Sequence, residues 1–127
     1  MPRKYEDHLD GHGLNELISI TSDDQDMNAG AASHVYDFLI ECKDSEIRRV
    51  GRIQFQHGPR HDPGSKPGIT EAALYTVLIN RLRDFQAGPY ACRENAIQLT
   101  KLEECLHWTK ARADERARRG VLGRNAK

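Results

Sequence analysis

Two arginines near the C-terminus, Arg112 and Arg116, have the type and spacing that suit anion binding. Helical residues at i and i+4 are neighbours, so their guanidinium groups can converge on one diphosphate. Both lie on, or at the edge of, the helix face that carries Leu99 and Leu102. A charged side chain there must meet water, a carboxylate or an anionic ligand. The alternative is structural, because arginines near a helix C-terminus also interact favourably with the helix dipole.

A second pair, Phe85 and Asn95, flanks the turn in "FQAGPYACREN" (85–95). Phe85 is in step with Leu78 and Leu82, so its ordinary role is in the core. An aromatic ring at the end of such a stripe can instead stack on a base. Asn95 lies on an apolar stripe, where an amide needs hydrogen-bond partners. Those partners are either a neighbouring backbone or a ligand's hydroxyl or ring nitrogen.

The two pairs are too far apart to share a small ligand within one chain. Asn95 and Arg112 are separated by 17 residues, which is about 25 Å along a continuous helix. A shared site therefore requires a second, antiparallel copy that brings its arginines beside the first copy's Phe85 and Asn95. A two-fold dimer of this kind has two composite sites, one at each end.

The sequence does not predict a metal site or a cofactor. His8 and His12 are spaced i and i+4, as are His57 and His61, but such two-ligand fragments are common by chance. No third and fourth ligands follow at zinc-finger spacing.

Nor do the residues favour an enzyme. There is no GxSxG motif and no pair of carboxylates on one stripe, and Asp114 and Glu115, among arginines, are expected to form salt bridges. A metal-dependent phosphodiesterase that uses His57, His61 and Asp62 remains an alternative.

The segments that position these residues predict an α+β fold in a single domain, residues 1–127. Polar residues 1–13 predict a flexible arm. Residues 57–68, with three prolines and three glycines, predict an irregular loop. Three apolar segments within 14–56 predict the strands of a small antiparallel β-sheet: 14–20, 34–42 and 47–56.

A long C-terminal helical hairpin is predicted over residues 69–123. Thr70 is a plausible N-cap for a helix that runs to about Gln86. A second helix is expected from about 91 to 119, which contains no glycine or proline, and Gly120 ends it. At about 43 Å this helix is too long for one small domain to bury, which favours oligomerisation.

The distribution of charge and the cysteines indicate what the protein can bind and in which compartment it acts. The net charge is zero, but residues 1–46 carry 3 basic and 11 acidic side chains, whereas residues 110–127 carry 7 and 2. Such a gradient suits head-to-tail pairing with a second copy, or attraction of an anion. Three cysteines without a CxxC pair indicate a reducing cytoplasm. The sequence contains no apolar run of the kind that predicts membrane insertion or secretion.

From about Gly51 to Gly123 the chain resembles the phage Thoeris anti-defence sponge family, in its first described, helical-hairpin type. The resemblance is carried by "GRIQFQHGP" (51–59), "LINRLRDFQAGPYACRENAIQLTKLEECLHW" (78–108) and "TKARADERARRGVLG" (109–123). It implies a small oligomeric protein that sequesters a nucleotide second messenger without cleaving it. The implied ligand is the 1″–2′ glycocyclic ADP-ribose made by Thoeris TIR proteins, and the implied location is the host bacterial cytoplasm.

The resemblance also implies roles for individual residues. Phe85 corresponds to the phenylalanine that stacks on the ligand, Asn95 to the asparagine of "REN", and Arg112 and Arg116 to the paired terminal arginines. The implied sites lie between protomers of a homodimer, and some family members assemble further into a hexamer, a trimer of dimers. Arg60 is a candidate for a second nucleotide site, although a solvated loop arginine is the simpler interpretation.

Two alternatives remain beside this hypothesis. The protein could sequester the cyclic di- or trinucleotides of CBASS immunity, in addition or instead. Its basic terminal helix could also bind nucleic acid, which would predict strong salt dependence and no need for Asn95. The loop 57–68 and the tail 120–127 depart from the family pattern, and the N-terminal third has no match in it.

Overall fold

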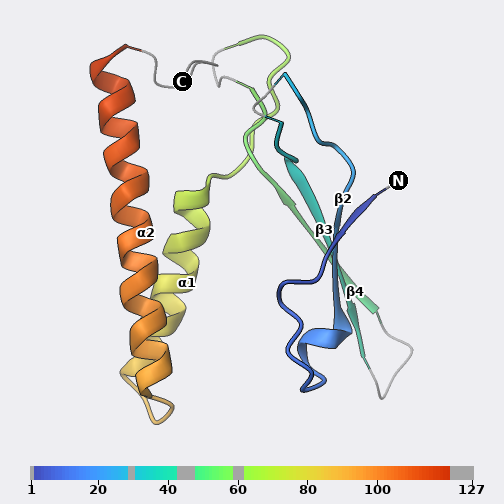
Figure 1. Cartoon of the computed structure of the whole chain (residues 1–127), viewed down its shortest axis with the longest axis vertical. Coiled ribbons are helices and arrows are strands. Elements are labelled where there is room, and N and C mark those ends of the chain that lie inside the picture. The colour runs from blue at the N-terminus through green and yellow to red at the C-terminus, as the bar shows by residue number, and fades with distance from the viewer. Residues whose placement is uncertain (1, 29–30, 43–47, 59–61, 121–127) are drawn as a thin grey trace. The chain divides into compact units, whose positions relative to one another are not determined.

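The computed structural model describes residues 2–28, 31–42, 48–58 and 62–120, and it contains two compact units, 1–68 and 69–127. The first unit is a β-sheet with its loops, and the second is a pair of helices (Figure 1). The predicted α+β fold, with a small antiparallel sheet before a helical hairpin, is confirmed.

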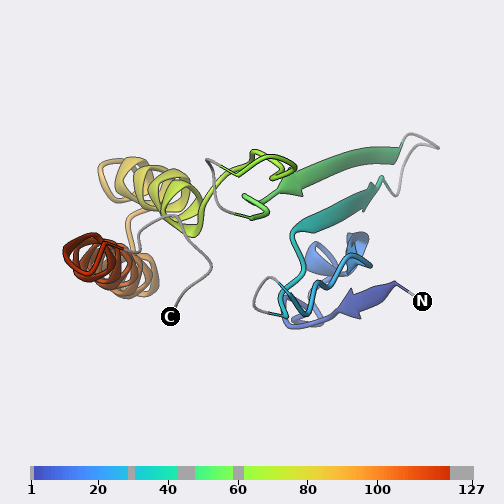
Figure 2. The same cartoon turned by 90° about the horizontal axis from the view of Figure 1, so that it is seen from above.

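The first unit is a four-stranded antiparallel meander in the order β1-β2-β3-β4. The predicted segments 34–42 and 47–56 contain β3 and β4. The segment 14–20 covers only the start of β2, because residues 15–17 form a 3-10 turn and β2 continues to Ser22. The structure adds a short edge strand, β1, inside the segment expected to be an arm, so β1 and β4 are the two sheet edges (Figure 2). The strand bounds are β1 Arg3–Tyr5, β2 Ile18–Ser22, β3 Val35–Glu41 and β4 Arg48–Gln54.

Strand β1 joins the sheet through a tyrosine that the sequence pattern did not single out. Tyr5 pairs with Ile20 across the strands, and its ring lies 5.6 Å from that of Tyr36. Its hydroxyl is 2.7 Å from Oγ of Ser22. The ring contact and the hydrogen bond together hold the three residues of β1, which belong to an otherwise polar segment, against the edge of β2.

The sheet is amphipathic, but its apolar face is only partly covered. Ile20 lies opposite Phe38, and Tyr36 lies opposite Ile53, so side chains of one face meet across three strands. These side chains are all of intermediate exposure. In the described part of this unit, the buried side chains are instead polar: Ser22, Ser33 and His34.

The end of the sheet is closed by the segment that follows β4. The amide of Phe55 donates to the carbonyl of His34 at 2.7 Å, and His57 and Lys66 exchange two backbone hydrogen bonds. Gly68 then passes so close to Phe55 that a Cβ atom at position 68 would lie 2.4 Å from the carbonyl carbon of Phe55. Only glycine permits this approach.

The second unit consists of α1, Glu71–Gln86, and α2, Arg93–Arg118. The predicted cap is confirmed, since the Thr70 hydroxyl accepts a hydrogen bond from the amide of Ala73. Helix α2 begins two residues later than expected because Cys92 is extended and serves as the N-cap residue. Gly120, with φ of 73°, follows the helix end in the left-handed conformation typical of this position.

The two helices pack antiparallel side by side (Figures 1 and 2) and bury little of their apolar surface. Ile79 of α1 is buried, and no described residue of α2 is. Val77 and Trp108 are 63% and 69% exposed. None of the described helices is long and apolar enough to cross a membrane.

Candidate functional site

The elbow between the helices is fixed by one glutamine side chain. Gln86 accepts from the amide of Cys92 at 3.0 Å and donates to the carbonyl of Cys92 at 3.1 Å. These two bonds close the turn 87–92, and Gly88 donates to the carbonyl of Phe85 within it. The elbow therefore holds the end of α1, with Phe85, and the first turn of α2, with Asn95, in a defined geometry.

Phe85 is half-buried, and its ring is flanked by two residues of the same hairpin. The guanidinium carbon of Arg81 lies 4.9 Å from the ring centroid. The ring of Tyr90 meets it edge-on, with centroids 6.3 Å apart and planes at 76°. Val77, Arg81, Asp84 and Phe85 line a surface hollow of 620 Å³. The ring thus borders open space large enough for a nucleobase.

Asn95 is half-buried in line with Leu99 and Leu102, as the helical spacing predicts. Its Oδ1 accepts a long hydrogen bond of 3.4 Å from Nε2 of Gln98. Within the described ranges no acceptor engages the Nδ2 group of Asn95, so this amide retains its capacity to donate to a ligand.

The two arginines lie at the opposite end of α2. Arg116 is half-buried and Arg112 is exposed, in agreement with their positions on and beside the apolar stripe. Among the residues with described positions, no carboxylate lies within ion-pair distance of Arg112. The expected ion pair of Glu115 is confirmed, with Arg119 at 2.6 Å. Arg112 thus keeps a charge available to an anion.

The structure therefore brings the four predicted residues into two groups rather than one. Phe85 and Asn95 flank the elbow, whereas Arg112 and Arg116 occupy the last turns of α2. The helix is continuous between them, which keeps Asn95 and Arg112 about 25 Å apart. Arg60 and its possible second site lie outside the described residues.

A groove runs between the two helices above the elbow. It has a volume of 480 Å³, with apolar walls and two cationic side chains, Arg81 and Lys101. The remaining lining residues are Leu78, Leu82, Ile97, Gln98 and Leu102. Arg81 borders both this groove and the hollow beside Phe85. Arg81 is not among the residues predicted from the sequence, although its i, i+4 spacing to Phe85 could have indicated it.

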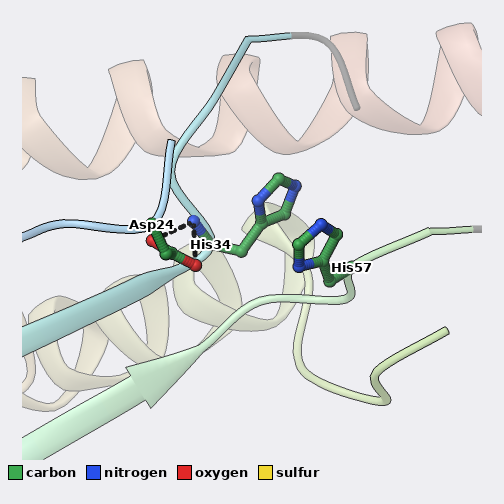
Figure 3. Close-up of side chains that lie close together, drawn as sticks. All are labelled: Asp24, His34 and His57. Atoms are coloured by element: carbon green, nitrogen blue, oxygen red, sulfur yellow. Dashed lines mark hydrogen bonds between the residues drawn. The ribbon is translucent and has the colours of Figure 1, made fainter. Parts of the chain in front are cut away.

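Of the two histidine pairs noted in the sequence, only His8 and His12 lie wholly within the described residues. His8 places Nε2 2.7 Å from the carbonyl oxygen of Ile18, whereas His12 is exposed. His61 lies outside the described residues. A different cluster is present, in which Asp24, His34 and His57 lie close together at one end of the sheet (Figure 3). The sequence could not indicate it, because its members are 10 and 23 residues apart.

A small antiparallel sheet followed by a helical hairpin, with candidate ligand residues at both ends of the long helix, defines a helical-hairpin class of protein. The model of the Acb2/Tad1 hairpin domain matches residues 48–114, more than half of the chain. The chain therefore belongs to this anti-Thoeris sponge family.

A curated relative is the protein named Thoeris anti-defense 1 of Bacillus phage SBSphiJ7. The two sequences are 40% identical over 79 residues, which cover 62% of this chain and 55% of the relative. The chain thus spans about half the length of the relative that it matches.

Proposed function

We propose that the protein is a phage anti-defence protein that binds and sequesters, without degrading it, the 1″–2′ glycocyclic ADP-ribose of Thoeris immunity. The observation that carries this proposal is the division of the four candidate residues between the elbow, with Phe85 and Asn95, and the C-terminal end of α2. In that arrangement Phe85 and Asn95 bind the base and hydroxyl groups of the ligand. Arg112 and Arg116 of a second copy bind its diphosphate.

The exposed apolar surface of the hairpin supports a dimer. Four apolar side chains of this two-helix unit are between 42% and 69% exposed: Val77, Leu78, Ile97 and Trp108. An antiparallel second hairpin would remove such side chains from water. It would also set the arginine end of one α2 beside the elbow of the other. The dimer can assemble further into a hexamer.

The chemistry of the site suits binding rather than turnover. Its side chains are an aromatic ring, an amide and two guanidinium groups, none of which is a ready nucleophile or general base at neutral pH. A molecule sealed between two chains with its diphosphate on two arginines can be bound tightly. The protein requires no cofactor for this role and acts in the cytoplasm of the infected bacterium.

The decisive experiment separates retention from conversion. The protein is incubated with the cyclic ADP-ribose isomer, freed of unbound ligand by filtration and heat-denatured, and the released molecule is analysed by mass spectrometry. We expect intact ligand at about one molecule per chain. The variants Phe85→Ala and Arg112→Ala should retain at least tenfold less, whereas the control Lys110→Ala should retain as much as the wild type.

Other outcomes, from this assay and from a DNA-binding titration, would favour the alternatives. A chemically altered product would indicate an enzyme, and retention of cyclic di- or trinucleotides in place of the ADP-ribose isomer would redirect the proposal to CBASS signals. Binding of duplex DNA that weakens steeply with salt and is unaffected by Asn95→Ala would indicate nucleic-acid binding. If no nucleotide is retained and all variants behave alike, the sponge proposal is wrong.

A further inference from the structure

The most buried part of the first unit is a polar cluster, which is unusual for a unit of this size. Ser22, Ser33 and His34 are its buried side chains in the described part, at 3%, 6% and 8% exposure. No described apolar side chain of this unit is buried. Small domains that lack an adequate apolar core are commonly stabilised by a disulfide or a metal ion. The cysteines of the chain are free, so no disulfide supplies this stability.

One ring nitrogen of His34 is buried within this polar cluster. Its Nδ1 is inaccessible to water and has no hydrogen-bond partner among the described residues. A buried ring nitrogen without a partner costs free energy unless a proton donor, an acceptor or a metal ion engages it. His34 therefore has coordination capacity that the described chain itself leaves unused.

His57 lies face to face with His34 and is oriented by a carboxylate. The two ring centroids are 4.0 Å apart, with planes at 4° (Figure 3). Nε2 of His57 lies 2.7 Å from Oδ2 of Asp26. An ionised carboxylate can only accept, so the neutral ring carries its proton on Nε2 and leaves a lone pair on Nδ1. A carboxylate that fixes the tautomer of a metal-binding histidine is a recurrent feature of metal sites.

Asp24 provides a carboxylate beside the two rings. Its oxygens accept hydrogen bonds of 3.0 to 3.2 Å from the amides of His34 and Val35, which fix its orientation. Figure 3 shows the bonds from His34. Burial acts to raise the pKa of Asp24, but the hydrogen bonds from Val35 and His34 outweigh it and lower the pKa. The carboxylate is therefore ionised at neutral pH.

From this geometry we propose that Asp24, His34 and His57 form a binding site for a divalent first-row transition metal ion, of which Zn²⁺ is the best fit. One potential ligand atom from each residue lies within 4.8 Å of the others. Tetrahedral Zn²⁺ with bonds of about 2.0–2.1 Å needs ligand atoms about 3.4 Å apart, so the three side chains must move closer and the two stacked rings must tilt until their in-plane lone pairs converge on the ion. Two imidazoles and a carboxylate favour zinc over Mg²⁺ or Ca²⁺, which prefer oxygen ligands.

The metal would connect three segments of the first unit. Asp24 follows β2, His34 precedes β3 and His57 follows β4, so one ion joins residues from three parts of the chain. The cross-link would stabilise the end of the sheet where polar side chains replace an apolar core. With three protein ligands, one coordination position remains for water. Asp26 acts as a positioning residue for His57.

The test uses the full chain after removal of metal with a chelator. Zn²⁺ is titrated calorimetrically, and Co²⁺ is added as a spectroscopic probe of coordination. We expect one Zn²⁺ per chain, visible Co²⁺ bands typical of nitrogen and oxygen ligands, and a higher thermal midpoint with Zn²⁺. Zn²⁺ affinity should fall by more than 100-fold in His34→Gln and His57→Gln and by about tenfold in Asp26→Asn.

Matched controls separate this site from incidental binding. His12→Gln and His107→Gln remove exposed histidines and should leave Zn²⁺ affinity unchanged. A variant with Cys42, Cys92 and Cys105 changed to serine should bind equally well. An intense thiolate-to-cobalt band that is lost in this cysteine variant would overturn the assignment.

A measurement on the unaltered protein keeps the proposal testable if the histidine variants do not fold. Nitrogen-detected NMR of the histidine side chains reports which ring nitrogens bind metal during a Zn²⁺ titration. The resonances of His34 and His57 should shift at one equivalent, and that of His12 should not. Unchanged resonances of His34 and His57 at saturating Zn²⁺ would show that the two rings form a metal-free stacked pair, and the proposal would fail.

Discussion

The guanidinium carbon of Arg81 lies 4.9 Å from the centroid of the Phe85 ring, one turn away on the same helix. An i, i+4 cation–π contact of this kind fixes the ring plane and covers one of its faces. Tyr90 meets the same ring edge-on, so Arg81 and Tyr90 together hold the orientation in which Phe85 borders the surface hollow.

We expect Arg81→Gln to weaken binding of the cyclic ADP-ribose isomer about two- to fivefold, because an exposed cation–π contact contributes about 0.5–1 kcal/mol. Isothermal titration calorimetry measures this change. The matched control is Arg83→Gln, since Arg83 pairs with Glu103 at 3.1 Å and does not contact the ring. Equal affinities of both variants and the wild type would show that Arg81 has no part in ordering Phe85.

The separation of Asn95 from Arg112 predicts complementation between two defective chains. Asn95→Ala and Arg112→Ala should each retain little ligand alone. A heterodimer of the two has one site with both defects and one intact site. After unfolding and co-refolding of an equal mixture, half of the dimers are mixed, so about one quarter of the wild-type sites return. Recovery of no ligand by a properly refolded mixture would argue that each site is formed within one chain.

The contact between Gly68 and Phe55 predicts a large effect from one methyl group. Gly68→Ala places Cβ at 2.4 Å from the Phe55 carbonyl carbon and 2.5 Å from the Gln54 carbonyl oxygen, and backbone atoms cannot move aside cheaply. We expect a loss of about 1–3 kcal/mol in the free energy of unfolding, measured by urea denaturation.

Gly51→Ala is the control for this substitution, because a Cβ there meets no described atom within 4 Å. A Gly68→Ala protein as stable as Gly51→Ala would mean that the chain passes Phe55 less closely than the structure has it.

The loop that precedes β2 should lose order at low pH. Hydrogen bonds from the amides of Gly13, Gly11 and Asp10 lower the pKa of Glu16 below its ordinary value of 4.5. A lowered folded-state pKa contributes stability above the unfolded value, and this contribution is lost as pH falls through the folded pKa. The loop should therefore remain ordered at pH 5 and loosen below pH 4.5.

Amide NMR of Gly13 as a function of pH measures this transition. We expect a midpoint below 4.5 in the wild type and no such transition in Glu16→Gln. A wild-type midpoint at or above 4.5 would contradict the hydrogen-bond pattern.

Local signals in the sequence were enough to predict the hairpin and its candidate residues. The helical period, the Thr70 cap and Gly120 depend on neighbours within one or two turns, and they determined the ends of both helices to within two residues. The same period placed Asn95 and Arg116 in the half-buried stripe. The distance between Asn95 and Arg112 follows from the continuity of α2 alone.

The tertiary structure alone decided the contacts between residues that are distant in the chain. Strand β1 forms because Tyr5 meets Tyr36 and Ser22, which no local pattern of residues 1–13 could indicate. Asp24, His34 and His57 meet only because three segments of one sheet end at the same place. The faces of a helix follow from the spacing of residues along that one element. A loop carboxylate meets two imidazoles only after the strands between them have paired.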